Sequence, residues 1–505
     1  MFCAYPLAVV VSANVGTLPL DMFVIGRSML VALVAIILIV RLLKRFQPDV
    51  AARAMWMNWV LLVLTFYESA LQQWRLLGFT TGAADPRFAV IYVFAALSLA
   101  TVVSQPWKAY KRNPIPLNLF AAALLGATLY PVAAWGMTAS LDWRQPADAL
   151  IKSALSASVR PTTAPARDIY YLILDGMGRR DTLAELYDVD LSALVTFLKD
   201  KGFYVADASQ SNYAQTYLSL ASTLNMNYLD DVAGVMRNSR DRHPLDYLVQ
   251  NNALMQAARK SGYQVVGISS DYLVTERWDG ADICLCPRYG LDELEQRAIW
   301  KTPLAALPLG RWTYGAHRRK VAGSLESIGE FSSQDHAPVF VLAHVIAPHP
   351  PFVFGPDGSP RQPPQGVEFD FSDGNHFLGS RREYISGYRD QTQFVTRELI
   401  ALVESLLKRS GTPPVIVIHG DHGPGAMLDW KTARGTNMRE RMSIFAAYYF
   451  PDSGPVLYPD ISPVNGARTL ATRYLGLQLP LLADKSFFST WDDPYGFIPV
   501  EPSAR

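Results

Sequence analysis

An apolar run, Val415–Ile418, leads through glycine into the adjacent pair Asp421-His422. The run limits the fold strongly, because it is typical of a buried β-strand, and open α/β sheets build their sites beyond the carboxyl ends of such strands. A carboxylate and a neutral imidazole both bind ions such as Zn²⁺ or Mn²⁺, so this pair is a candidate metal site. The pattern alone leaves open a solvated pair in a surface loop.

A second apolar run upstream ends in the same way. Ile169–Leu174 is followed by Asp175 and by the glycine turn Gly176-Met177-Gly178. A carboxylate at this place is a second candidate metal ligand. The alternative is that Asp175 caps a helix that follows the strand.

A candidate nucleophile lies in Ser211–Leu224, where a polar loop changes into an apolar helical pattern at Thr216. A side chain at the N-terminus of a helix lies where backbone N–H groups and the helix dipole favour anions such as phosphate. Thr216 could instead only cap the helix, and Ser219 or Ser222 could take its place as the hydroxyl.

Together the three segments resemble, in order and spacing, the alkaline phosphatase/sulfatase superfamily, and the resemblance extends over Asp168–Asp484. It implies one divalent metal ion, Zn, Mn or Mg, bound by Asp175, Thr216, Asp421 and His422, with Thr216 as the catalytic nucleophile. The alternation of expected helices and strands after residue 168 favours an α/β domain of the alkaline-phosphatase-like type, a three-layer α/β/α sandwich.

The sequence separates some of the chemistries of this superfamily. Sulfatases that use formylglycine need Cys or Ser before Pro-Ser-Arg, whereas this chain has Thr216-Tyr217-Leu218-Ser219, so that mechanism is disfavoured. Two-metal phosphatases need a histidine well after the Asp-His pair, and none follows His422, which argues against a second, histidine-rich metal site. The chain looks like lipoteichoic acid synthase and the phosphoethanolamine transferases, although those enzymes usually have Glu where Asp175 stands.

The first third of the chain has the composition of a membrane region, which we predict to contain five transmembrane helices. A helix that spans the hydrocarbon core needs about 20 mostly apolar residues. Five segments approach this requirement: Met1–Leu20, Met22–Val40, Met55–Trp74, Phe88–Trp107 and Asn113–Leu141. The first could be a signal peptide, but it lacks a basic start and another apolar run follows at once.

Lys and Arg side chains set the expected orientation of this region. They are concentrated in two alternate loops, 41–54 and 106–115, while the other loops contain only Arg27, Arg75 and Arg87. The positive-inside rule places the first two loops in the cytoplasm. The metal-binding domain then faces the periplasm or the exterior, attached to the cytoplasmic (inner) membrane.

These boundaries give a transmembrane region at 1–141, a linker at 142–167 and a catalytic domain at 168–505. The net charge of +1 at pH 7 does not indicate a nucleic acid as partner. Cys284 and Cys286 form a Cys-x-Cys whose direct disulfide would be strained, so we assign them no role beyond packing or incidental redox chemistry.

His349 lies in the Pro-rich segment Ala347–Phe352, just past the expected strand Val339–Val345. By the resemblance it helps to bind the substrate phosphate; the alternative is a hydrogen bond within the loop. The expected enzyme moves a phosphoglycerol or phosphoethanolamine unit from a phospholipid donor to an envelope glycan or lipid acceptor through phospho-Thr216. A membrane-anchored sulfatase-like hydrolase or phosphodiesterase, with water as the acceptor, would have the same visible site. A non-catalytic envelope protein would lack the metal ligands, and this chain has them.

Overall fold

In the computed structural model, the described residues are 49–76, 86–103, 143–158, 166–285, 302–306, 309–330, 338–362, 369–409, 411–451 and 457–501, with scattered residues at 30–45, 119–130 and 295–299. The chain divides into two compact units. The first contains Met1–Ser140, Gly290–Thr313 and Pro363–Phe369, and the second contains Leu141–Tyr289, Tyr314–Gln362 and Asp370–Arg505.

In the first unit, helices α3 (Val50–Leu76) and α4 (Pro86–Val103) pack through aromatic side chains. The ring of Tyr67 lies 5.3 Å, between centroids, from the rings of both Phe88 and Tyr92. The hydroxyl of Tyr92 donates a hydrogen bond of 2.9 Å to the carbonyl oxygen of Val63.

The predicted membrane crossings are not confirmed by these helices. No helix among the described residues is both long enough and apolar enough to cross a membrane. The helix α3 overlaps the predicted span Met55–Trp74 and contains Glu68, and α4 overlaps the span Phe88–Trp107 but ends at Val103. The other three predicted spans lie wholly or largely outside the described residues.

In the second unit, seven described strands form one sheet in the order β2-β7-β6-β1-β5-β3-β4. The pairs of β1 with β5 and β6, and of β3 with β4 and β5, are parallel. The strands are β1 (Ile169–Leu174), β2 (Tyr204–Val205), β3 (Gln264–Ile268), β4 (Ile283–Leu285), β5 (Val339–Val345), β6 (Val415–Gly420) and β7 (Ala446–Tyr449). A separate hairpin joins β8 (Ser486–Phe488) to β9 (Ile498–Val500).

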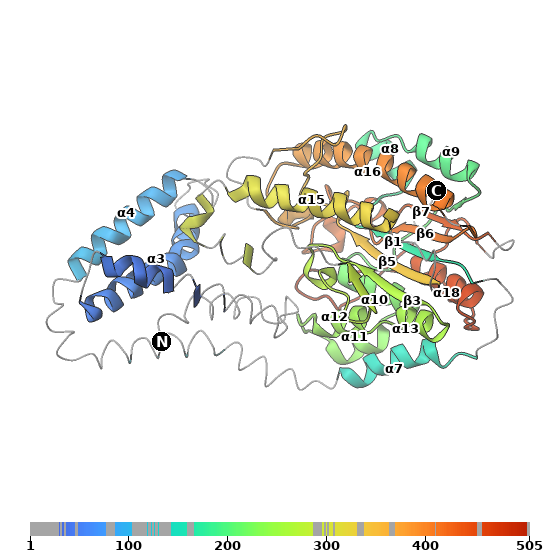
Figure 1. Cartoon of the computed structure of the whole chain (residues 1–505), viewed down its shortest axis with the longest axis horizontal. Coiled ribbons are helices and arrows are strands. Elements are labelled where there is room, and N and C mark those ends of the chain that lie inside the picture. Colours follow the sequence, from blue (N-terminus) through green and yellow to red (C-terminus); the bar gives the residue numbers. More distant parts are fainter. Residues whose placement is uncertain are drawn as a thin grey trace. The chain divides into compact units, whose positions relative to one another are not determined.

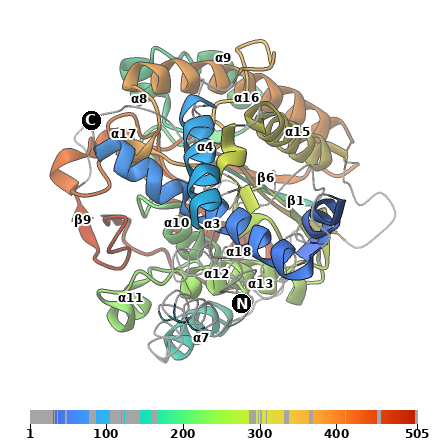
Figure 2. The same ribbon diagram turned by 90° about the vertical axis from the view of Figure 1, so that its left-hand side faces the viewer.

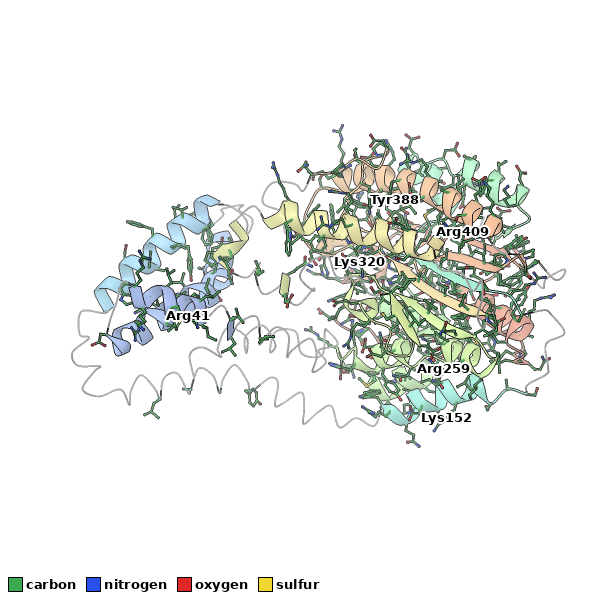
Figure 3. All side chains as sticks on the ribbon, in the orientation of Figure 1. Arg41, Lys152, Arg259, Lys320, Tyr388 and Arg409 are labelled. Carbon is green, nitrogen blue, oxygen red and sulfur yellow. The ribbon has the colours of Figure 1, made fainter. Side chains whose placement is uncertain are left out.

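Helices cover both faces of the sheet, which confirms the predicted three-layer sandwich (Figures 1 and 2). One face carries α8 (Arg180–Tyr187), α9 (Ser192–Asp200), α15 (Leu309–Glu330) and α16 (Arg381–Arg409). The other carries α10 (Thr216–Leu224), α11 (Asp230–Met236), α12 (His243–Gln250), α13 (Ala253–Lys260) and α18 (Pro463–Tyr474). Side chains fill the space between the sheet and both helical layers (Figure 3).

The central strand β1 shows why an uninterrupted apolar run forms a strand in the middle of the sheet. All its residues are buried, and Ile169, Tyr171 and Ile173 belong to the same core cluster as residues of α10, α12 and α13. The alternate residues of β1 face the opposite helical layer. A strand buried on both faces needs apolar side chains at every position, not at every second one.

The strands at one edge of the sheet depart from the parallel pairing that helices between strands favour. The strand β7 runs antiparallel to β6, and β2 runs antiparallel to β7. The physical reason is the connection between β6 and β7, in which the only α-helix is the five-residue α17 (Met438–Met442). Without a long crossover helix the chain stays at the carboxyl edge of the sheet, so the next strand must run back.

Two features of the second unit were not predicted from the sequence. Residues Arg144–Leu155, within the expected linker, form α7, whose side chains Ala147, Leu150, Ile151 and Ala154 belong to the core. Cys284, whose role the sequence left unassigned, is disulfide-bonded. Its partner lies outside the described residues.

Candidate metal centre

Three parallel strands end side by side and bring distant segments of the chain together. The strand β1 lies between β5 and β6, and Leu174 is level with Val345 and Gly420. Asp175 and Asp421 directly follow two of these strand ends, and both are buried. The carboxyl edge of the sheet therefore carries two carboxylates that are far apart in the sequence.

The turn after Asp175 connects the three strand ends. Gly176 has a φ of +75°, which residues with a side chain rarely adopt. Its N–H donates to Oδ1 of Asp421 over 3.0 Å, and the carbonyl oxygen of Asp175 accepts from the N–H of His349 over 3.0 Å. The segments that follow β5 and β6 are thus tied to the end of β1.

Thr216 is the first residue of α10, a helix whose residues are all buried. The preceding Gln215 has an extended backbone and does not cap the helix, because its side-chain amide instead donates to Oγ of Ser489 over 2.9 Å. The hydroxyl oxygen of Thr216 lies 3.0 Å from Nε2 of His422.

The two serines that the sequence left as alternatives to Thr216 point elsewhere. The hydroxyl of Ser219 donates to the carbonyl oxygen of Asp421 over 2.8 Å, and that of Ser222 donates to the carbonyl oxygen of Ser219 over 3.0 Å. Of these three hydroxyls, Thr216 is the one that faces the histidine of the Asp-His pair.

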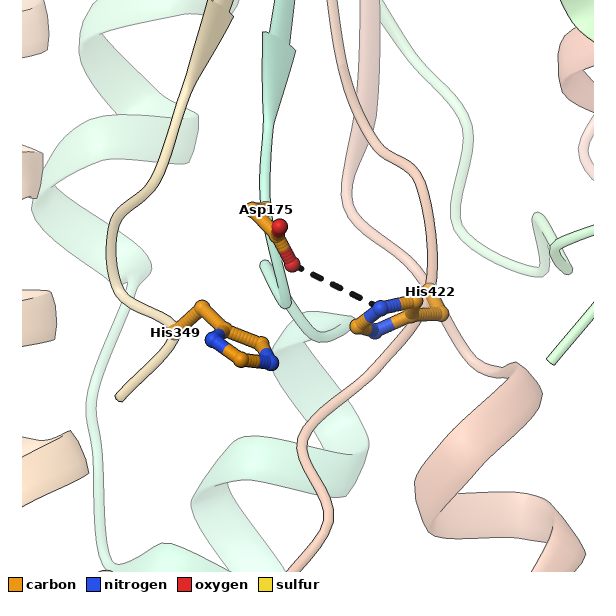
Figure 4. A group of neighbouring side chains, drawn as sticks. All are labelled: Asp175, His349 and His422. Atoms are coloured by element: carbon orange, nitrogen blue, oxygen red, sulfur yellow. Dashed lines mark ion pairs between the residues drawn. The ribbon is translucent and has the colours of Figure 1, made fainter. Parts of the chain in front are cut away.

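Nε2 of His422 is the centre of the group. It lies 3.0 Å from Oγ1 of Thr216, 3.2 Å from Oδ2 of Asp421 and 3.5 Å from Oδ1 of Asp175, the last contact being drawn in Figure 4. In a tetrahedral zinc site with bonds of about 2.0–2.1 Å, neighbouring ligand atoms lie roughly 3.3–3.4 Å apart. His422 Nε2 lies at about this distance from one oxygen of each of the other three predicted residues.

Two carboxylate oxygens of this group are buried without a hydrogen bond. Oδ1 of Asp421 accepts from the backbone N–H groups of Gly176 and His422, at 3.0 and 2.9 Å. Its Oδ2, like Oδ1 of Asp175, accepts no hydrogen bond from the part of the chain that the structure describes. Buried carboxylate oxygens of this kind are costly unless they are paired or coordinate a metal. The residues present fit a divalent cation.

The imidazole of His422 has the tautomer that a metal ligand needs. Its Nδ1 lies 2.9 Å from the carbonyl oxygen of Gly423, which only accepts, so Nδ1 carries the hydrogen. Burial, and next the guanidinium of Arg441, lower the pKa of His422. The neutral ring then presents the lone pair of Nε2 to the oxygens of Thr216, Asp421 and Asp175.

His349 lies on the other side of the Asp175 carboxylate (Figure 4). Its Nδ1 is 2.6 Å from the carbonyl oxygen of Pro350, and its Nε2 is 3.6 Å from Oδ2 of Asp373. Burial alone would lower the pKa of His349, but Asp175 and Asp373 outweigh burial and raise it to about 9. His349 therefore carries a proton near neutral pH and can donate it to a bound oxygen.

Asp373, which sequence reasoning missed, lies beside Arg441. Both side chains are buried and form an ion pair. Arg441 also donates through Nε to the carbonyl oxygen of Ala214 over 2.8 Å, and Asp373 accepts from the hydroxyl of Tyr384 over 2.8 Å. Asp373 lies in an irregular segment with no periodicity, so no sequence signal marks it.

The ligand-type residues at this edge form two overlapping groups. Asp175, His349 and His422 are one group, and Asp175, His344 and Asp421 are the other. Within each group the possible ligand atoms lie within 4.8 Å of one another, and all the residues are buried.

Comparison with known proteins gives structural matches only. No protein-family model and no curated protein matches the sequence. Among solved structures, the C-terminal periplasmic domain of EcEptC from Escherichia coli matches with a TM-score of 0.42 and 12% identity, over 68% of this chain and 96% of that domain. Another structure of that domain is a complex with zinc.

Two further matches are similar in extent. The integral membrane lipooligosaccharide phosphoethanolamine transferase A from Neisseria meningitidis has a TM-score of 0.40 and 12% identity, over 77% of this chain and 68% of that one. The phosphonate monoester hydrolase from Silicibacter pomeroyi has a TM-score of 0.40 and 14% identity, over 62% and 74%. These are enzymes of the kinds that the resemblance in the sequence indicated. Because every one of these TM-scores lies below 0.5, the chemical argument rests on the site residues themselves.

Proposed function

We propose that this chain is a metal-dependent phosphotransferase of the alkaline phosphatase/sulfatase type. It would move a phosphoglycerol or phosphoethanolamine unit from a phospholipid to an envelope glycan or lipid through a phospho-threonine at Thr216. The single observation that carries the proposal is the spacing of 3.0–3.5 Å from His422 Nε2 to three oxygens, those of Thr216, Asp421 and Asp175. This spacing supports a role for Thr216 as a hydroxyl nucleophile beside buried metal ligands.

Thr216 supplies the nucleophile. A divalent ion bound by Asp175, Thr216, Asp421 and His422 would lower the pKa of the Thr216 hydroxyl and offset negative charge at phosphorus. Thr216 Oγ1, having lost its proton to water, would then attack the phosphorus of the phospholipid headgroup, and the bond from phosphorus to the diacylglycerol oxygen would break. The buried helix α10 holds this oxygen at the site before substrate arrives.

His349 supplies the proton that the departing diacylglycerol oxygen needs. Its Nδ1–H is occupied by the carbonyl oxygen of Pro350, so Nε2 carries the transferable proton. In the second half of the reaction the acceptor hydroxyl would attack the phospho-threonine and return a proton to His349 Nε2. The carboxylates of Asp175 and Asp373 raise the pKa of His349 and so favour its protonated form.

A lipid donor also explains the sequence of the first unit. The uncharged runs and the loop charges predict that residues 1–141 anchor the chain in the cytoplasmic membrane, with the metal domain on the outer side. Anchoring places the site where a phospholipid headgroup arrives by lateral diffusion.

The proposal is tested by release of diacylglycerol from vesicles of phosphatidylglycerol or phosphatidylethanolamine, using the full chain in detergent with zinc. Thr216→Ala should reduce release by at least about 10³-fold, because the nucleophile acts as a unit with its metal ligands. Thr223→Ala is the matched control, since Thr223 is a buried threonine of the same helix whose hydroxyl makes no hydrogen bond with the described residues.

Release that stays within a few fold of wild type in Thr216→Ala would contradict the proposal, as would a failure of wild type to act on either lipid. Release that proceeds without an added glycan or lipid acceptor, and yields a free headgroup phosphate, would show that water is the acceptor.

A further inference from the structure

His344 is a fully buried histidine that the proposed function does not use. It lies in β5, level with Ile173 of β1. Its Nε2 makes no hydrogen bond with the described residues and lies 3.5 Å from Oδ2 of Asp175. That separation exceeds the range of an N–H···O hydrogen bond but is close to the ligand–ligand spacing around one zinc ion.

The other nitrogen of His344 is held by a chain of hydroxyls. Nδ1 lies 2.9 Å from Oγ1 of Thr275, which lies 2.7 Å from Oγ of Ser270. Ser270 in turn donates to the carbonyl oxygen of Tyr272 over 3.4 Å. Either hydroxyl can donate in the contact between Thr275 and Ser270, so the chain can accept the hydrogen of Nδ1. With Nδ1 protonated, His344 presents the lone pair of Nε2 towards Asp175.

A second buried histidine shows that this arrangement is not general in the sheet. His419, on β6, which is separated from β5 by β1, has both ring nitrogens occupied. Its Nδ1 lies 2.8 Å from the carbonyl oxygen of Gly420, and its Nε2 lies 3.1 Å from the hydroxyl of Tyr171. His419 is therefore a satisfied core histidine, whereas His344 has one nitrogen left for a ligand.

We propose that Asp175, His344 and Asp421 bind a second divalent cation, beside the one at His422. The possible ligand atoms of these three buried residues lie within 4.8 Å of one another. Asp175 would bridge the two ions, because its Oδ1 faces His422 and its Oδ2 faces His344, each at 3.5 Å. Oδ2 of Asp421 accepts no hydrogen bond from the described residues, so it too can bind the second ion.

The second ion would change the charge of the site. One divalent ion is neutralised by the carboxylates of Asp175 and Asp421, since Asp373 already faces Arg441. A second ion adds two positive charges. These would balance one negative charge on the phosphodiester group and one on the ionised oxygen of Thr216. With three protein ligands it also keeps a coordination position open for a substrate oxygen, as catalytic metal sites do. The sequence argued against a second site because no histidine follows His422, but this site uses one upstream histidine.

The test is the number of zinc ions bound per chain. The full-length protein, stripped with a chelator, is dialysed against buffered free zinc and analysed by mass spectrometry of the metal and by competition with a chromophoric chelator. Wild type should bind two ions. His344→Asn keeps a polar group near Thr275 and removes Nε2, so it should bind one.

His419→Asn is the matched control and should still bind two ions, because neither nitrogen of His419 is available as a ligand. Thr275→Val leaves His344 in place but removes the group that orients it, and should weaken the second ion by about 10–100-fold. Thermal unfolding of each metal-free variant establishes that it is folded.

One ion in wild type, or two in His344→Asn, would overturn the proposal. A single ion that is lost in His422→Asn and unaffected in His344→Asn would leave the proposed function standing while removing the second ion. No tightly bound ion in wild type would contradict both.

Discussion

Replacing Arg441 by Met should destabilise the second unit strongly. Arg441 and Asp373 are almost fully buried, with side-chain exposures of 1% and 4%. The substitution roughly conserves volume but removes the guanidinium that pairs with Asp373. Among the described residues it leaves the carboxylate with Tyr384 and the N–H of Gly374, both at 2.8 Å, and with His349, whose Nε2 lies 3.6 Å away. Removing one partner of a buried ion pair costs about 3–5 kcal/mol, and since His349 at 3.6 Å is a weaker partner than Arg441, most of this cost should remain.

The assay is thermal unfolding of the full chain in detergent with a chelator, so that metal binding does not contribute. A domain of roughly 340 residues has an unfolding entropy of about 0.7 kcal/mol/K, so the loss corresponds to a fall in Tm of about 4–7 °C. Arg259→Met is the matched control, because Arg259 (labelled in Figure 3) pairs with Asp282 at the surface, with exposures of 44% and 33%. A surface pair contributes about 0–1 kcal/mol, which is a shift of at most about 1–2 °C.

The double substitution Arg441→Met with Asp373→Asn should unfold at a higher temperature than Arg441→Met alone, because it removes the uncompensated charge. Two results would refute this reasoning. One is a fall in Tm for Arg441→Met no larger than that of Arg259→Met. The other is a double variant that is as unstable as the sum of the two single changes.

Three further outcomes follow from the structure. A Cβ on Gly423 would lie 2.0 Å from the carbonyl oxygen of Glu440, so Gly423→Ala should lower the free energy of unfolding by about 1–3 kcal/mol or more. Gly234→Ala is the control and should be neutral or stabilising, because Gly234 lies in α11 and a Cβ there would meet no atom within 4 Å. Equal unfolding temperatures for the two variants would contradict this. Burial raises the pKa of Glu440 from 4.5 to about 7, so the folded state binds the proton more tightly than the unfolded state. Wild type should therefore lose about 1–3 kcal/mol of stability between pH 5 and pH 8, relative to Glu440→Gln. Parallel pH profiles of Tm for the two proteins would exclude this effect. His349→Asn should slow release of diacylglycerol by about 10²–10⁴-fold but slow a p-nitrophenyl phosphodiester much less, since that leaving group needs no proton; equal losses on both substrates would remove the general-acid role.

The strands that carry the site were predictable because their chemistry is local. Ile169–Leu174 and Val415–Ile418 are buried on both faces, which demands apolar residues at every position, and each ends in the carboxylate that enters the site. The start of α10 at Thr216 was likewise visible as a change from a polar loop to an apolar helical pattern. The fold of this domain followed from such patterns because helices and strands alternate along the chain.

The parts that were not predictable depend on contacts between distant segments. Asp373 and Arg441 meet across 68 positions of sequence, from segments without periodicity. The antiparallel direction of β7 depends on how residues 421–445 stay at one edge of the sheet, which no local pattern expresses. The vacant nitrogen of His344 is visible only once its neighbours are placed, since the same residue type two strands away, His419, is fully hydrogen-bonded.

Intact mass spectrometry of the zinc-loaded chain after brief exposure to phospholipid tests the central claim most directly. The account predicts an adduct with the mass of phosphoglycerol or phosphoethanolamine on wild type and on Thr223→Ala, absent from Thr216→Ala, with fragmentation placing it on Thr216. An adduct that persists in Thr216→Ala, or a zinc-loaded wild type that releases diacylglycerol without any adduct under rapid quenching, would contradict a phospho-threonine intermediate at this residue.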